Sequence, residues 1–192
     1  MPTEPQAEDQ SPVEIRKFDP AQFDRAGFDC GVPRLNNFIQ RSAKKQQKDD
    51  IVRVYVATRP GERIILGYHS LNAYSLAADD LGPLKPKATP PHNTLPALYL
   101  SMIAVSLRAQ GAGLGSILLD HAKQKALAVA DTVGAHAMVL DVMEDGGENA
   151  TARRMAWYAK HGFQTFPDAP LKMFLPVATI RRTYAMLNAL PD

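Results

Sequence analysis

The segment RAQGAGLGSILLD, residues 108–120, places three alternating glycines directly before a run of good helix formers. Glycine allows backbone N–H groups to approach a ligand closely and adopts φ values that other residues avoid. The first turn of a helix adds unpaired N–H groups and a partial positive charge. The combination predicts a site for an anion such as a phosphate. A glycine-rich turn that serves only tight packing of a strand against a helix is the alternative.

Two nucleotide-binding motifs can be compared with this segment. The P-loop motif G-x-x-x-x-G-K-[ST] is excluded, because no glycine followed by lysine stands five residues after Gly111 or Gly113. The dinucleotide motif G-x-G-x-x-G is weakened, because Ser116 occupies the place of its third glycine. The motif Q-x-x-G-x-G is matched in full by Gln110, Gly113 and Gly115.

Basic residues are unevenly distributed along a chain whose formal net charge is only +2. One group lies between residues 34 and 53 and consists of Arg34, Arg41, Lys44, Lys45, Lys48 and Arg53. A second group lies toward the C-terminus and consists of Arg153, Arg154, Lys160, Lys172, Arg181 and Arg182. Such runs are typical of a solvated helix face. They also suit a phosphate-binding surface for a nucleic acid, so charge alone leaves both interpretations open.

The length of 192 residues fits one domain, and we expect a disordered tail over residues 1–12 before a single domain over residues 13–192. No apolar run reaches about 18 residues, and the first residues do not form a signal peptide. We therefore expect a cytoplasmic protein without a membrane span. Cys30 is the only cysteine, which excludes an internal disulfide framework. The five histidines show no metal-ligand spacing, so no metal site is expected.

Turn signals and hydrophobic spacing predict a mixed α/β order, with a strand–helix unit at the glycines. The expected strands are residues 13–18, 52–59, 63–77, 97–107, 135–143 and 171–180. Expected helices start near Pro33, run from the glycines to about Ala130, and span 147–163 and 179–190. The proline-rich residues 79–97 are expected to form an irregular loop.

Finer expectations concern the buried faces and two glycines. The first helix is expected to bury Leu35, Phe38, Ile39 and Ser42. The helix after the glycines is expected to bury Leu114, Ile117, Leu118, Ala122 and Val129. Gly67 is a candidate β-bulge, and Gly162 is a candidate helix stop.

A strand containing MIAVS, then Q-x-x-G-x-G, a helix, a strand and the segment WYAKHGF follow one another along the chain. This order resembles the GNAT superfamily of N-acetyltransferases. The resemblance implies a single α/β domain with a mixed, mostly antiparallel central sheet flanked by helices. It also implies acetyl-CoA as cosubstrate, without a metal. The residues that would bind the diphosphate of acetyl-CoA are Gln110, Gly111, Ala112, Gly113, Leu114, Gly115 and Ser116. The end of the preceding strand would bind the pantetheine arm and polarise the thioester, through Ile103, Ala104 and Val105.

Tyr158 stands five residues before Phe163, where this superfamily places its general acid. A phenol with a pKa of about 10 can protonate a thiolate whose pKa is about 8.5, provided that the two groups lie within hydrogen-bond distance. Packing of the ring alone is the alternative role of Tyr158. Asn149 is a candidate pantetheine contact, with the N-cap of a helix as the alternative.

A narrower resemblance lies in FDCGVPRLNNFIQRSAKKQQKDD, residues 28–50, together with ILGYHSLNAYSL and LKMFLPVATI. These segments resemble the acetyltransferase toxins of toxin–antitoxin modules. The resemblance implies acetylation of the α-amine of an aminoacyl-tRNA, a block of translation, a ribbon-helix-helix antitoxin as partner and a homodimer. It assigns tRNA binding to Arg34, Arg41, Lys44, Lys45 and Lys48. Related toxins more often carry an arginine near Met102, and this departure concerns the substrate contacts.

Acid–base chemistry favours an α-amine as the acceptor. No aspartate or glutamate stands out in the sequence as a dedicated general base. An α-amine with a pKa of about 7.7–8.0 is partly neutral in the cell, whereas a lysine amine with a pKa of about 10.4 needs more assistance to lose its proton. Two alternatives stay open: an enzyme that acetylates a small-molecule amine or a protein N-terminus, and an acyl-CoA-binding module without turnover.

Overall fold

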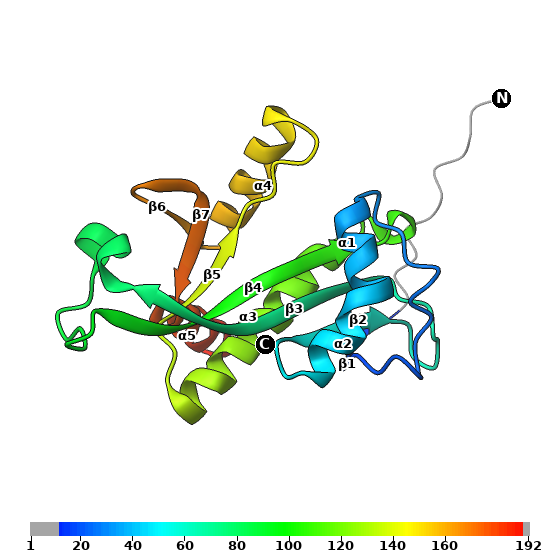
Figure 1. The fold of residues 1–192 in the computed structure, drawn as a ribbon, viewed down its shortest axis with the longest axis horizontal. Coiled ribbons are helices and arrows are strands. Elements are labelled where there is room, and N and C mark those ends of the chain that lie inside the picture. Colours follow the sequence, from blue (N-terminus) through cyan, green and yellow to red (C-terminus); the bar gives the residue numbers. More distant parts are fainter. Residues whose placement is uncertain (1–11, 190–192) are drawn as a thin grey trace. The chain divides into compact units, whose positions relative to one another are not determined.

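The computed structural model describes residues 12–189, and Figure 1 shows the fold. The strands are β1 (Glu14–Lys17), β2 (Arg53–Thr58), β3 (Gly67–Ala77), β4 (Thr94–Val105), β5 (Ala137–Asp141), β6 (Gln164–Phe166) and β7 (Ala169–Pro176). The α-helices are α1 (Pro33–Asn37), α2 (Ala43–Lys48), α3 (Leu114–Val133), α4 (Glu148–Lys160) and α5 (Val177–Asn188). A π-helical turn, η1 (Phe38–Ser42), joins α1 to α2, and 3-10 helices form η2 (Ala78–Leu84) and η3 (Leu107–Ala109).

The strands form a mixed sheet in the order β1-β2-β3-β4-β5-β7-β6. Strand β1 pairs antiparallel with β2, and β7 pairs antiparallel with both β5 and β6. Strands β4 and β5 are parallel, and the chain crosses from one to the other through α3. A parallel pair needs such a crossover. The predicted fold class and the strand–helix unit at the glycines are therefore confirmed.

The chain divides into two compact units. The first consists of the chain up to Ser70 together with Met102–Asp120. The second consists of Leu71–Ser101 together with the chain from His121 onward. The predicted N-terminal tail lies outside the described residues, except for Pro12. Each unit has its own buried cluster and is described by itself.

In the first unit, the start of α3 packs into a cluster that also contains Ala57 and Leu66. Gly67 lies at a close approach, because a Cβ there would stand 2.8 Å from the Leu118 side chain and 2.9 Å from the carbonyl oxygen of Ala104. The glycine predicted as a bulge therefore has a packing role. The predicted buried face of α3 is wrong at Ile117, which is 48% exposed and points away from the core.

The first helix buries Leu35, Phe38 and Ile39 as predicted, but Ala43 is buried in place of Ser42. The reason is the π-helical turn η1, which places one more residue in the turn than an α-helix does. The buried face is thereby shifted by one position from α1 to α2.

The second unit has a core on one face of its strands, formed by Leu76, Ala78, Leu81, Leu95, Ala97, Ala137, Val139, Phe166 and Phe174. The short helix η2 contributes Ala78 and Leu81, so the loop predicted at residues 79–97 is partly ordered. Strand β4 also begins earlier than predicted, at Thr94, and includes Pro96. Strand β6 was not predicted, because three residues are too few to show a period of two.

Candidate functional site

The glycine turn before α3 has the backbone geometry of an anion site. Gly111 and Gly113 have φ values of +88° and +77°, which residues with a Cβ rarely adopt. A Cβ built on either glycine would meet no atom within 4 Å, so tight packing does not explain them. Between residues 12 and 189, the N–H groups of residues 111–115 find no hydrogen-bond acceptor. These groups lie at the positive end of a 20-residue helix and can bind phosphate oxygens.

The side chain of Gln110 points back into the protein. Its Nε2 donates hydrogen bonds to the carbonyl oxygen of Val105 at 3.0 Å and to that of Cys30 at 3.3 Å. Both side-chain N–H groups of Gln110 are therefore used within the first unit. The side chain fixes the glycine turn to the end of β4 and to the segment before α1. Only the main-chain N–H of Gln110 is left for an anion.

A second network holds the segment that Gln110 contacts. The Asn36 side chain, on α1, accepts the backbone N–H of Cys30 at 2.9 Å and donates to the Asp29 carboxylate at 2.6 Å. The N–H of Gly31 also donates to Asp29 at 2.8 Å, and these two bonds hold the pKa of Asp29 below its usual value. Cys30 is buried, and burial raises the pKa of its thiol. A protonated, buried thiol is a poor nucleophile, so Cys30 has a structural role.

Basic side chains line one exposed face along α1, η1 and α2. The opposite face is buried through Leu35, Phe38, Ile39 and Ala43. The exposed cations are Arg34, Arg41, Lys44, Lys45 and Lys48, and none of them forms an ion pair within the part of the chain that the structure describes. We refer to these five residues as the basic face. Unpaired cations on one face create a positive potential that attracts phosphate groups.

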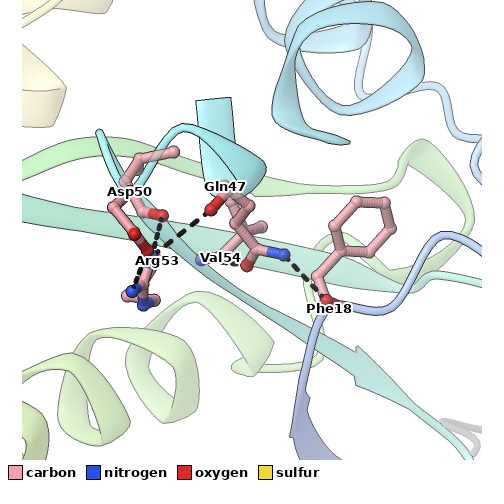
Figure 2. A network of polar contacts seen from close by, with 6 residues as sticks. Phe18, Gln47, Asp50, Arg53 and Val54 are labelled. Carbon is pink, nitrogen blue, oxygen red and sulfur yellow. Dashed lines mark hydrogen bonds and ion pairs between the residues drawn. The ribbon is translucent and has the colours of Figure 1, made fainter. Parts of the chain in front are cut away.

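Arg53 belongs to the same basic run but not to the basic face. Figure 2 shows its guanidinium bound to the Asp50 carboxylate, at 2.5 Å. Beside it, the Gln47 side chain donates to the carbonyl oxygen of Phe18 at 2.9 Å and accepts the N–H of Val54 at 2.9 Å (Figure 2). These bonds fasten the end of α2 to β2. The helix that carries Lys44, Lys45 and Lys48 is therefore fixed at its C-terminal end.

The second basic group of the sequence does not form a comparable surface. Arg154 donates hydrogen bonds to the main-chain carbonyls of residues 143 and 145, at 2.8 and 2.6 Å. Lys172 donates to the hydroxyl oxygen of Tyr74 at 2.5 Å, and Arg181 forms an ion pair at 2.7 Å. These three cations are used inside the second unit, which leaves the group without a continuous unpaired face.

Tyr158 on α4 is buried, with 9% of its surface exposed, and its ring packs edge-on against Trp157 and Phe163. Its hydroxyl forms no hydrogen bond with the residues between 12 and 189, although buried phenols usually find a partner. Burial raises the pKa of Tyr158 to about 12, and the charge of Arg154 opposes this shift. The phenol is thus protonated at neutral pH and has a proton to offer to a ligand.

Asn149 lies near the start of the same helix. Helix α4 begins at Glu148, and its N-cap is Gly147, with a φ of 80°. Asn149 is the second residue of the helix and is exposed, so the N-cap alternative is wrong. The assignment of Asn149 to the pantetheine arm stays a prediction.

Strands β4 and β5 stop pairing before either strand ends. Their register joins Ala97–Tyr99 to Ala137–Val139, and β5 then continues to Asp141. The register between the two strands ends at Tyr99 and Val139, two residues before the end of β5. Further along β4, Ile103 and Val105 are partly buried against the cluster at the start of α3, and their predicted pantetheine contacts stay a prediction.

Two absences hold for residues 12–189. No helix there is long and apolar enough to cross a membrane. No group of three or more His, Cys, Asp or Glu side chains is arranged to hold a metal ion.

A mixed sheet with a glycine turn between a central strand and its crossover helix is typical of a GNAT acetyltransferase. The chain belongs to this family, because residues 50–165 match the acetyltransferase (GNAT) domain. The chain is 40% identical over 167 residues to the probable toxin TacT of Sinorhizobium fredii, covering 87% of this chain and 92% of the relative. It is 29% identical over 153 residues to a tRNA-acetylating toxin of Mycobacterium tuberculosis, covering 79% of this chain and 85% of that protein.

Solved structures confirm the fold. AtaT complexed with acetyl-methionyl-tRNA has a TM-score of 0.79 and 24% identity, and the match covers 90% of this chain and 99% of AtaT. A tyrosine-to-phenylalanine mutant of KacT has a TM-score of 0.78 and 22% identity, and the match covers 89% of this chain and 98% of KacT.

Proposed function

We propose that the chain is an acetyl-CoA-dependent N-acetyltransferase whose acceptor is the α-amine of an aminoacyl-tRNA, so that the charged tRNA is blocked for translation. The observation that carries this proposal is the basic face, whose cations are exposed and unpaired in the described chain. A small amine needs no such surface, whereas an RNA backbone binds it through phosphate contacts. The name of one relative, a tRNA-acetylating toxin, supports tRNA as the substrate, and that of the other, a probable toxin, supports a toxic role.

The cosubstrate acetyl-CoA supplies the acetyl group as a thioester. We assign its diphosphate to the N–H groups of residues 111–115, with Ser116 in the same helical turn. The fit rests on the positive φ values of Gly111 and Gly113 and on the open space beside both glycines. A structure of AtaTR bound with acetyl-CoA supports the cosubstrate. Gln110 contributes by holding the turn in shape, and the β4 residues Ile103–Val105 offer main-chain groups to the pantetheine arm.

Tyr158 is assigned as the general acid that gives its proton to the departing sulfur. A pKa of about 12 keeps the donor form fully populated at neutral pH. Transfer from this phenol to a thiolate with the ordinary pKa of about 8.5 would be uphill by about 3.5 pKa units. Burial raises the pKa of a thiol as it raises that of a phenol, so the difference narrows inside the protein. An α-amine loses its own proton near neutral pH and needs no strong base.

We also propose that the chain binds an antitoxin protein. A structure of an AtaT mutant bound to the C-terminus of the antitoxin AtaR supports an antitoxin that binds the toxin directly. We expect the antitoxin of this chain to belong to the ribbon-helix-helix class, and we expect the acetyltransferase to be a homodimer. Coexpression with the neighbouring reading frame, followed by measurement of the mass of the complex in solution, tests both expectations.

The function is tested with purified protein, labelled acetyl-CoA and total tRNA that is either charged or stripped of amino acids. We expect label on the charged pool alone. Label on neither pool, with acetyl-CoA still bound, would overturn the tRNA acceptor and favour small amines or protein N-termini. Failure to bind acetyl-CoA would overturn the proposal as a whole.

A further inference from the structure

Four side chains from four neighbouring strands of the second unit meet in one network: Tyr74 of β3, Tyr99 of β4, Asp141 of β5 and Lys172 of β7. The hydroxyl of Tyr99 donates a hydrogen bond to Oδ2 of Asp141. The Nζ of Lys172 donates to the hydroxyl oxygen of Tyr74 at 2.5 Å. The rings of the two tyrosines stack with their centroids 5.4 Å apart and their planes at 27°.

The two charges of this network do not pair with each other. Asp141 and Lys172 are directly opposite in the antiparallel β5–β7 pair, where unlike charges usually attract. Within the described residues no ion pair joins them. The Lys172 ammonium lies 4.8 Å from the centroid of the Tyr74 ring and 5.8 Å from that of Phe166 instead. The exposed Asp141 carboxylate therefore keeps one oxygen available for a ligand.

The network lies at the point where β4 and β5 separate. Tyr99 and Val139 are the last paired residues of the two strands, and Asp141 follows Val139 by two positions. The bond from Tyr99 to Asp141 thus spans the two strands where their main-chain ladder ends. An exposed carboxylate there has a fixed direction, because the phenol holds one of its oxygens.

We propose that Asp141, oriented by Tyr99, binds the α-ammonium group of the acyl acceptor. A carboxylate beside stacked aromatic rings suits an ammonium ion, because both the charge and the ring faces attract it. The inference rests on the proposed function, in which the acceptor is an amine. An α-amine with a pKa of about 7.7–8.0 reaches the enzyme mostly as ammonium at neutral pH. Asp141 is a positioning residue: it captures the charged acceptor, and the proton then leaves to water before acetyl transfer.

Binding of two tRNA pools tests the inference without any turnover. One pool is charged with amino acids, and the other is esterified with the corresponding α-hydroxy acids, which lack the ammonium group. The wild-type protein is expected to prefer the aminoacyl pool by about fivefold to tenfold. Asp141→Asn keeps the shape of the side chain and the bond from Tyr99, and this variant should bind both pools equally. A preference that survives in Asp141→Asn, or that is absent from the wild type, would overturn the inference.

The matched control is Asp168→Asn, which makes the same charge change at an exposed residue between β6 and β7. This variant should keep the preference of the wild type. Loss of the preference in both variants would show an effect of net charge and would contradict a specific role of Asp141. Since these measurements use binding alone, they decide on Asp141 even where labelled transfer fails and the proposed function falls.

The pH dependence of kcat gives a second readout that structural damage would not imitate. A carboxylate beside the bound amine stabilises its ammonium form and raises its pKa. In Asp141→Asn the rising limb of kcat should move to lower pH, while KM for charged tRNA increases. Tyr99 contacts Asp141, Lys172 lies opposite Asp141 in the β5–β7 pair, and Tyr74 contacts Tyr99 and Lys172. The substitution leaves all three of these side chains in place. An unmoved limb with an unchanged KM would overturn the inference.

Discussion

Gln110 donates its side-chain amide to the carbonyl oxygen of Cys30 at 3.3 Å, which links the glycine turn before α3 to the segment before α1. Asn36 of α1 accepts the backbone N–H of the same Cys30 at 2.9 Å. The proposed phosphate site and the basic face of the first unit therefore share one set of polar contacts. A change in these contacts is expected to affect both.

Asn36→Ala removes a partner from Cys30 and from Asp29 at once. A lost hydrogen bond that leaves a buried group unsatisfied costs about 1 to 3 kcal/mol in the free energy of unfolding. We expect a loss of this size in denaturant unfolding and a severalfold weaker affinity for acetyl-CoA in calorimetry. Asn37→Ala, at the exposed neighbouring position, is the control and should change neither quantity. Unchanged acetyl-CoA affinity in Asn36→Ala would show that the network does not position the glycine turn.

Gly113→Ala tests the anion site in the first unit. The φ of +77° at Gly113 makes any Cβ unfavourable by about 1 kcal/mol, although space is open beside it. Gly134→Ala is a matched control, since Gly134 has a φ of +82° and the same open surroundings. Both variants should lose similar stability, but only Gly113→Ala should lose affinity for acetyl-CoA, at least tenfold. Equal affinities in the two variants would contradict a phosphate site at the glycine turn.

Tyr158→Phe removes the proposed acid and keeps the ring packing against Trp157 and Phe163. General acid catalysis contributes about 10²-fold to 10⁴-fold, so we expect kcat to fall within this range while acetyl-CoA affinity stays the same. The donor form of Tyr158 exists below its pKa of about 12. The kcat of the wild type should therefore show no alkaline fall until the pH approaches that value. Full activity in Tyr158→Phe would leave Tyr158 with a packing role alone.

Reversal of three charges on the basic face tests RNA binding. Lys44, Lys45 and Lys48 changed together to Glu should weaken tRNA binding at least tenfold and reduce its salt dependence by about 2 in the log–log slope. Acetyl-CoA binding should not change. The control changes the exposed Lys17, Lys87 and Arg182 to Glu, with the same change in net charge. Equal losses in both triple variants would indicate attraction by net charge, without a specific surface.

Local chemistry made the glycine turn and the buried face of the first helix predictable. The conformational freedom of glycine and the helical spacing of apolar residues are local properties, and they were sufficient to predict the turn at Gly111 and Gly113. The π-helical turn was not predictable from a period of 3.6 residues, and the prediction for Ser42 failed for this reason. The N-cap alternative for Asn149 is wrong because Gly147, which has a positive φ, occupies that position.

Contacts between residues on strands that are distant in the sequence could not be predicted from the sequence. Lys172 and Tyr74 are 98 residues apart, and Tyr99 and Asp141 are 42 residues apart. Neither pair has a spacing that marks it, because the strand order of the sheet brings the residues together. The residues of the network around Asn36 are close in sequence, because they all lie inside the segment FDCGVPRLN. That segment supported the resemblance, but the hydrogen bonds among its side chains required the structure.

The chemical identity of the acetylated product shows whether the acetyl group is transferred to the amino acid or to the RNA. After reaction of charged tRNA with acetyl-CoA, mild base releases the ester-linked residue, and mass spectrometry identifies it. We expect an N-acetylated amino acid, with the RNA itself unmodified. Acetyl groups found on nucleotides, or amino acids released only in their free form, would contradict an acetyltransferase that acts on the α-amine of aminoacyl-tRNA.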